Sequence, residues 1–370
     1  MRKIGILLLL LLIFINVLYV ISGALHFSLR SVDVYAIWLF KAKAFYITDG
    51  LPLKILNDNR YLYSHPNYPL LLPYIFSLIY KVVGGAKEIY IFLLYPFVYT
   101  SILLIVYKLL RKLKIGVLLA LIFVYSYSMS GPFLAQGGRY HAGTADIFLV
   151  LLNWIIIYFA YLYHKKSNNK YLLFIVLLTA VASQIKAEGV FISTVLLFLP
   201  VKRSKKIILF TLSLIPTLIW LSLIKRWGMP SDLTYFIPSV YEIISRSFDI
   251  LKYVAIEMLN YKNWYIFWPL FFISLFITKN TSAFFKNTIY PSTIIISLTF
   301  FSVYLFTKEV TPIEYVPASI DRILFQLSPL FCLIFTLSIP SLFISHHKVS
   351  RHLYPGDKEL ENNKQRKLVF

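Results

Sequence analysis

A carboxylate stands just after the first apolar stretch of this chain. Asp33 follows an uncharged run, residues 4–21, and is itself followed by Lys41 and Lys43. A carboxylate within hydrogen-bond reach can take the proton of a hydroxyl nucleophile, and neighbouring ammonium groups suit an anionic leaving group. This segment therefore predicts a general base beside an anion-binding site.

The same segment has a plainer interpretation. If residues 33–47 form a helix at the membrane surface, its charges can simply face water, with Val34, Trp38 and Phe45 facing the lipid. Both interpretations predict the helix, and only the first gives Asp33 a chemical task. Asp49 and Asp58, further along, lie in what read as ordinary turns.

Other polar side chains stand at the ends of apolar runs, where a charge is costly and needs a partner or a task. Several precede a run, and two of them sit in a tight turn between runs. They are His65, Arg139, His141, Asp146, Lys186, Glu188 and Arg322. On the topology given below, all of them converge on the same side of the membrane as Asp33.

Each of these residues also has a structural interpretation. Asp146 at the start of a helix is favourable for the helix dipole alone. Lys186 and Glu188 can pair with each other, and Arg322 can pair with Asp321. The sequence leaves these alternatives open.

Several kinds of site lack their usual pattern. His65 and His141 are not part of an HxxxH or HExxH motif, so no cofactor is expected, although a divalent metal is left open. The chain has neither a glycine-rich nucleotide loop nor a serine nucleophile elbow. A nucleotide sugar as direct donor is therefore unsupported.

Composition defines the class of protein. Hydrophobic residues make up 59% of the chain and charged residues 14%, and apolar runs of membrane-spanning length recur throughout. More than half of the basic residues lie in the termini and in the short loops expected to be cytoplasmic, as the positive-inside rule requires. The net charge of +21 is explained in this way, and no nucleic-acid partner is expected.

The apolar runs predict ten spans with both termini in the cytoplasm. The first run is interpreted as an uncleaved span, and 66–85, interrupted by prolines at its start, as an interfacial helix that does not cross. Long external loops are then expected at 23–87 and 225–263. The expected spans are 4–22, 88–107, 115–133, 146–163, 171–186, 188–201, 207–224, 264–278, 288–306 and 323–344.

The predicted fold is therefore an all-α polytopic membrane protein with interfacial helices in its first external loop. One transmembrane domain is expected over 1–345, followed by a basic cytoplasmic tail, 346–370. The cytoplasmic (inner) membrane is the expected location, and the lipid bilayer is the first partner.

The order and sidedness of these motifs resemble the GT-C superfamily of membrane glycosyltransferases. The nearest branches are the protein O-mannosyltransferases and the lipid A aminoarabinose transferases. The resemblance covers about residues 1–330. It is carried by Asp33, Trp38 with Lys41-Ala-Lys43, His65-Pro-Asn-Tyr-Pro69, Gly143-Thr-Ala-Asp146, Lys186-Ala-Glu-Gly189 and Ser319-Ile-Asp-Arg322.

The resemblance implies transfer of a sugar from a polyprenyl-phosphate carrier to a glycan, lipid or protein acceptor on the external side. Asp33 would be the general base and Asp146 the assisting carboxylate. The substrate-binding candidates are Lys41, Lys43, His65, Arg139, His141, Lys186, Glu188 and Arg322. Many members carry two adjacent acidic residues in the first loop, whereas Val34 follows Asp33 here.

Two other functions remain open. A transporter or flippase for lipid-linked sugars would use the same basic and aromatic residues, and would show inverted repeats or broken helices. A polymerase or ligase of surface glycans would have a large external loop late in the chain, whereas the longest loop here is early.

Overall fold

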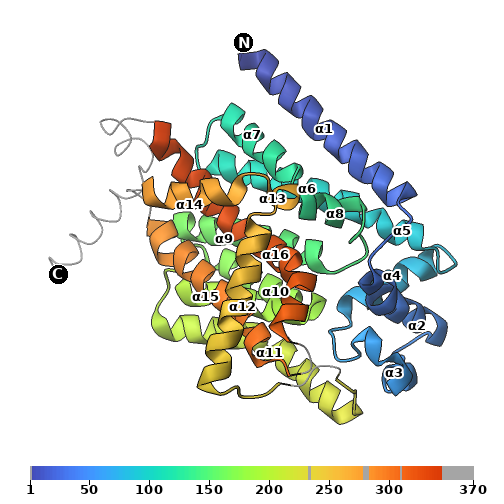
Figure 1. The fold of residues 1–370 in the computed structure, drawn as a ribbon. Coiled ribbons are helices and arrows are strands. Elements are labelled where there is room, and N and C mark those ends of the chain that lie inside the picture. Colours follow the sequence, from blue (N-terminus) through green and yellow to red (C-terminus); the bar gives the residue numbers. More distant parts are fainter. Residues whose placement is uncertain (1, 232–234, 278–282, 309–310, 344–370) are drawn as a thin grey trace.

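The chain folds into packed helices (Figure 1). The computed structural model describes residues 2–231, 235–277, 283–308 and 311–343, and the expected basic tail lies outside them. Within these ranges the structure contains no β-strand, and its only extended pairing is an isolated bridge between Tyr235 and Thr307. The predicted all-α class is confirmed.

Six of the described helices are long and apolar enough to cross a membrane, and a bent pair brings the number to seven. The six are α1 (Arg2–His26), α5 with α6 (Glu88–Phe92 and Leu94–Lys112), α9 (Asp146–Lys166), α11 (Arg203–Trp227), η4 with α15 (Phe285–Ile289 and Tyr290–Phe306) and α16 (Pro312–Phe343). They match six expected spans, and the chain is a polytopic membrane protein.

The bent pair replaces the expected span 115–133. Helix α7 (Val117–Ser128) and helix α8 (Gly131–Gly138) meet at an angle of 69°. The bend lies at Met129 and Ser130, and Pro132 at the start of α8 suits the first turn of a new helix.

The remaining expected spans are shorter. They correspond to α10 (Asn169–Ile185), the 3-10 helix η3 (Ala187–Phe198) and α14 (Phe267–Ile277). Helix α4 (Leu71–Val82), in the segment expected not to cross, has a similar length. The total of ten spans therefore stays a prediction.

The first long loop folds into a compact group of short helices. These are the π-helix η1 (Val34–Leu39), α2 (Phe40–Thr48), α3 (Leu53–Leu56), the 3-10 helix η2 (Asn59–Ser64) and α4, all in blue in Figure 1. A helix over 33–47 is confirmed, but its lipid-facing residues are wrong. Val34, Trp38 and Phe45 are buried against the protein, because α4 and η2 cover that side.

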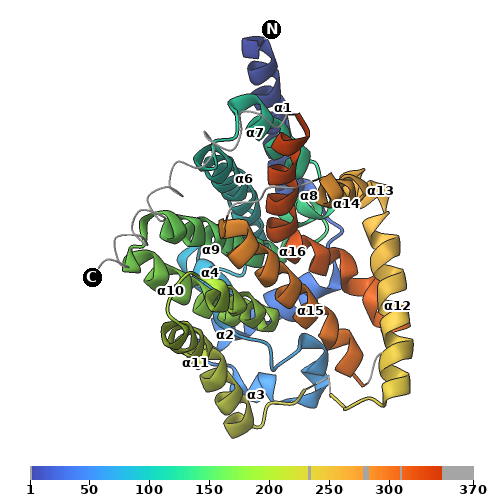
Figure 2. The same cartoon turned by 90° about the vertical axis from the view of Figure 1, so that its left-hand side faces the viewer.

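Two parts of the chain differ from the predicted arrangement. The expected loop 225–263 contains α12 (Val240–Met258) and α13 (Tyr261–Trp264). Helix α12 buries Ile250 and Val254 and packs along α15 and α16 (Figure 2). The last span starts at Pro312 instead of 323, so Arg322 lies inside α16 and not before it.

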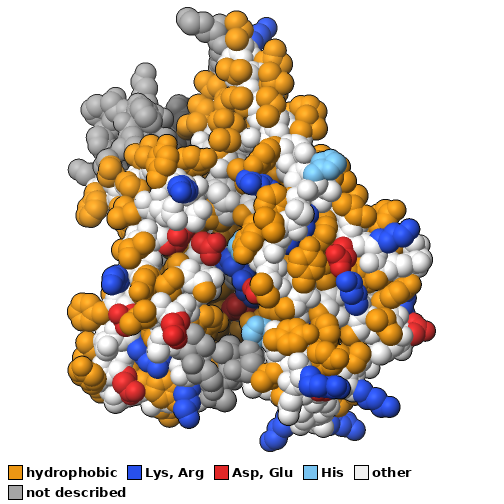
Figure 3. All heavy atoms as spheres, turned by 45° about the vertical axis from the view of Figure 1, so that its right-hand side comes forward, with side chains coloured by type: hydrophobic (Ala, Val, Ile, Leu, Met, Phe, Trp, Pro, Cys, Tyr) orange, Lys and Arg blue, Asp and Glu red, His pale blue; other side chains and the backbone are white. Residues whose placement is uncertain are grey.

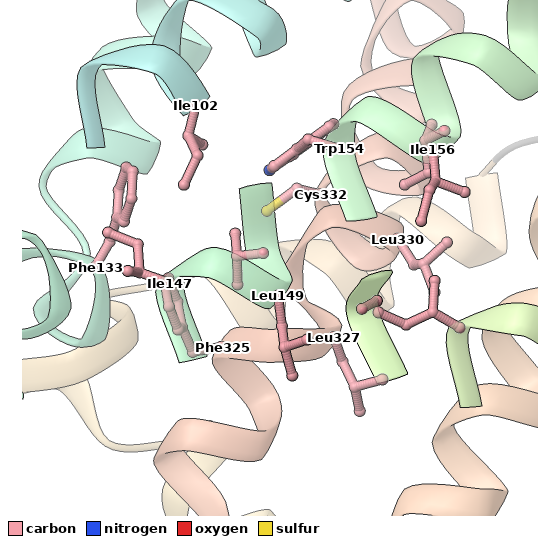
Figure 4. Close-up of a cluster of buried hydrophobic side chains, with 14 of the residues drawn as sticks. Ile102, Phe133, Ile147, Leu149, Trp154, Ile156, Phe325, Leu327, Leu330 and Cys332 are labelled. Carbon is pink, nitrogen blue, oxygen red and sulfur yellow. The ribbon is translucent and has the colours of Figure 1, made fainter. Parts of the chain in front are cut away.

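The core lies between α6, α8, α9 and α16. Ile102, Phe133, Trp154 and Phe325 come from these four helices and are fully buried (Figure 4). By contrast, α1 and α11 bury only 11% of their most apolar windows. Their apolar side chains face outward, as expected for helices that have lipid as solvent.

Candidate functional site: a buried charge network

Asp146 is the centre of a buried polar network. Its side chain has no solvent exposure. Oδ1 accepts hydrogen bonds from Lys186 Nζ at 3.0 Å and Gln326 Nε2 at 2.6 Å, and Oδ2 accepts from Arg322 Nε at 2.7 Å and Gln136 Nε2 at 3.2 Å. Buried charge is tolerated only when it is paired and hydrogen-bonded, and here a carboxylate meets two cations.

Arg322 joins this network to the first external loop. While its Nε donates to Asp146, its Nη1 donates to Asp33 Oδ2. One guanidinium therefore holds two carboxylates that lie far apart in sequence. The Asp33 side chain is 35% exposed, compared with 14% for Arg322 and 0% for Asp146. Asp33 is thus the accessible end of a buried chain of charges.

Lys186 is the second cation that pairs with Asp146. Its Nζ lies 3.0 Å from Asp146 Oδ1 and 3.0 Å from Glu188 Oε1, and its side chain is 7% exposed. The expected pair with Glu188 is confirmed, with Asp146 as a second partner. The charge-network residues, a term used below for Asp33, Asp146, Lys186, Glu188 and Arg322, come from four separate parts of the chain.

Two glycines allow the backbone approaches that bring these parts together. Gly143 has φ +121°, and a Cβ there would lie 2.3 Å from Val34 Cγ1. The loop before Asp146 can therefore lie against the residue after Asp33 only if position 143 lacks a side chain. At Gly189, a Cβ would lie 2.1 Å from the carbonyl oxygen of Ala182, which fixes the tight turn that carries Lys186 and Glu188.

The backbone at Asp33 is itself unusual. Asp33 precedes the π-helix η1, whose wider winding passes into the α-helix α2 at Phe40. Short π-helical segments are rare and are found often at functional sites. An ordinary helix was predicted here.

Lys41, Lys43 and His65 have partners outside the charge network. The fully buried Lys41 donates from Nζ to the carbonyl oxygen of His65 at 2.7 Å. The His65 ring stacks on Tyr68 with ring centroids 4.7 Å apart. Lys43 forms an ion pair with Glu88. Lys41 thus joins α2 to the His65 loop, and Lys43 joins α2 to α5. These contacts hold the first long loop together and do not require a bound substrate.

Arg139 and His141 both lie in the loop before Asp146. The Arg139 guanidinium sits over Phe27 at 5.1 Å from the ring centroid, next to the end of α1. His141 Nε2 lies 3.9 Å from Asp321 Oδ2. Burial and the neighbouring Arg322 charge together lower the pKa of His141 to about 4, so its ring is neutral at pH 7.

Three residues of the site were missed by sequence reasoning. Gln136 and Gln326 orient Asp146, and a polar side chain inside an apolar run was the available sign for Gln326. Arg30 donates to the carbonyl oxygens of Arg139 at 2.7 Å and Ala24 at 3.0 Å and so ties the end of α1 to the loop before Asp146. Burial lowers the pKa of Arg30.

Figure 3 shows a hollow in which acidic and basic side chains gather between two largely apolar parts of the surface. No group of three or more His, Cys, Asp or Glu side chains within the described ranges is arranged to hold a metal ion.

One comparison with known proteins finds a match. The family model described as dolichyl-phosphate-mannose-protein mannosyltransferase matches residues 65–225. The matched segment runs from the His65 loop to the end of α11 and includes Asp146 and Lys186, while Asp33 and Arg322 lie outside it. No curated protein and no solved structure matches this chain. The match and the apolar helices together support the expected resemblance to membrane glycosyltransferases of the GT-C superfamily.

Proposed function

We propose that this protein moves a sugar from a polyprenyl-phosphate carrier to an acceptor hydroxyl on the external side of the cytoplasmic membrane, with Asp33 as general base. The observation that carries the proposal is the accessible Asp33 carboxylate held by Arg322, whose other edge is held by the fully buried Asp146. A base must be both reachable and fixed in position, and Asp33 meets both requirements.

The reaction exchanges one glycosidic bond for another. The acceptor oxygen attacks the anomeric carbon, its proton passes to Asp33, and the carrier phosphate leaves with the bonding electrons. Arg322 is placed to stabilise the phosphate, because it is the more exposed of the two network cations. The acceptor can be a glycan, a lipid or a protein.

Asp146 and Lys186 receive a different role from the one first expected for them. An acidic side chain without solvent exposure cannot touch substrate as it stands, so we assign Asp146 as a positioning residue for Arg322. Lys186, held between Asp146 and Glu188, neutralises the buried carboxylate. Both residues then act on Asp33 through Arg322.

A transfer assay tests the general base. Membranes containing the Asp33→Asn variant, supplied with a polyprenyl-phosphate sugar, should transfer sugar at least about 100-fold more slowly than wild type. The matched control is Asp49→Asn, the same change in the same loop at a carboxylate that is 83% exposed and paired with Lys81. Transfer at the wild-type rate by Asp33→Asn would refute the assignment.

One observation favours a second function. The bent pair α7 and α8 is a broken helix of the kind found in transporters. A transporter or flippase for lipid-linked sugars would move its substrate without forming a new glycosidic bond. This function would be supported if the Asp33→Asn variant moved lipid-linked sugar across vesicle membranes at the wild-type rate and neither protein formed a transfer product.

A further inference from the structure

An apolar cavity lies apart from the charge network. Its volume is about 390 Å³, and it is bounded by α7, the bend before α8, the turn between α13 and α14, and the second half of α16. Phe123, Phe267 and Phe335 are among its wall residues. Along α16, its wall begins at Cys332, ten residues or roughly 15 Å beyond Arg322.

The chemistry of the walls selects an uncharged ligand. None of the residues that line the cavity is Lys, Arg, His, Asp or Glu. The wall includes Ser130, which is buried and whose hydroxyl has no hydrogen-bond partner among the described residues. A buried hydroxyl without a partner is costly, so a bound group that accepts one hydrogen bond would stabilise it. A hydrocarbon chain with one ester or carboxyl oxygen fits both features.

The cavity is continuous with the lipid-facing surface of the protein. Three of its wall residues, Ile122, Ile266 and Leu270, are 44%, 58% and 40% exposed. They extend the outward-facing apolar surface of the membrane helices into the cavity. A chain from the surrounding bilayer can therefore enter sideways without crossing polar surface.

The volume limits the length of that chain. An apolar cavity of about 150 Å³ holds benzene, so a cavity of 390 Å³ holds roughly 15 carbon atoms. This is the size of one fatty acyl chain, and a polyprenyl carrier chain is several times too long to be contained. We propose that the cavity binds a single fatty acyl chain of a membrane phospholipid. This inference does not depend on the proposed transfer reaction.

A bound chain would support the charge network from a distance. The cavity is lined by Met129 and Ser130, the two residues at which α7 bends into α8. Helix α8 also carries Gln136, which donates to Asp146. Filling the cavity should therefore favour the bent arrangement that places Gln136, and so stabilise the folded protein.

Cysteine labelling tests occupancy. The only cysteine is removed by Cys332→Ala, and Ser126→Cys then places a thiol on an exposed wall position. With the full chain in a sterol-based detergent, dipalmitoyl phosphatidylcholine at about ten times its Kd should slow maleimide labelling roughly tenfold. The matched control, Ser222→Cys on the exposed surface of α11, should label at the same rate with and without lipid.

A second pair of variants tests the link to stability without labelling. Ser126→Trp should fill the cavity and remove the rise in melting temperature that the same lipid gives to wild type, whereas Ser222→Trp should keep it. Two kinds of result would overturn the proposal. In the labelling experiment they are equal slowing at both cysteines, no slowing at either cysteine, or stronger protection by a polyprenyl phosphate. In the melting experiment it is a lipid response in Ser126→Trp equal to that of wild type.

Discussion

Replacing Asp146 by Asn should strongly destabilise the folded protein. The change keeps the shape of the side chain and removes its charge. Lys186 Nζ and Arg322 Nε each lose a charged acceptor, at 3.0 and 2.7 Å, and the amide nitrogen must face at least one of the donors that now surround the carboxylate. Two hydrogen bonds to a charged group are together worth about 3–6 kcal/mol.

That value agrees with an independent estimate. Removing one partner of a buried ion pair costs about 3–5 kcal/mol, because it leaves charge without compensation. Some compensation remains here, since Lys186 keeps Glu188 and Arg322 keeps Asp33. We therefore expect a loss at the lower end, about 3 kcal/mol in the free energy of unfolding.

Thermal unfolding in detergent measures this effect, with Asp49→Asn as the exposed control of the same chemistry. Adding Lys186→Met to Asp146→Asn should recover part of the loss, because it removes the cation left in excess. The two changes should therefore be coupled by about 0.5–3 kcal/mol instead of being additive. An Asp146→Asn variant as stable as wild type, or strictly additive effects, would refute the description of Asp146 as the centre of the network.

The remaining predictions concern binding, topology and pH. Arg322→Met should reduce use of the polyprenyl-phosphate donor roughly 10–100-fold, and Lys186→Met should reduce it less at saturating donor. Transfer at varied donor concentration measures both effects. Unchanged donor use in both variants would remove Arg322 and Lys186 from the site. Cysteines introduced by Ser204→Cys and Asn57→Cys should label from opposite sides of the membrane in intact cells, and labelling of both from outside would exclude a shared external site. The pKa of His141 is about 4 in the folded protein and 6.5 ordinarily, so the unfolded chain binds a proton at His141 more tightly than the folded protein does. The free energy of unfolding should therefore fall as the pH drops from about 6.5 to 4, by at most about 3 kcal/mol. Melting temperatures at pH 7 and pH 5 should show a smaller difference in His141→Gln than in wild type, and an equal difference would contradict the assignment.

Lys41 and Arg322 show where reasoning from the sequence succeeded and where it failed. Lys41 was singled out as an ammonium group near Asp33, and Arg322 as a cation at the end of an apolar run, where charge needs a partner. Their partners could not be read from the chain: Lys41 binds the carbonyl of His65, whereas Arg322 binds Asp33 and Asp146. Ion pairs between residues this far apart in sequence depend on how helices pack, and that information is absent from local patterns.

Gln136 and Gln326 were missed for a related reason. A glutamine carries no charge, and its importance appears only when a carboxylate is placed beside it, at 3.2 Å and 2.6 Å here. The outward direction assigned to Trp38 was wrong because the first long loop folds back on itself as η2 and α4 and covers that residue.

The amino-acid sequence by itself determined the class of this protein, because apolar runs of spanning length have few stable states outside a membrane. It also singled out charged residues such as Asp33 and Asp146 near the ends of those runs, since charge is expelled from the hydrocarbon core unless it is paired. Only the tertiary structure decided which of them meet. Asp146 became a buried centre and Asp33 an accessible carboxylate because α9, α16 and the first loop pack around one guanidinium, with Gly143 leaving room for the close approach.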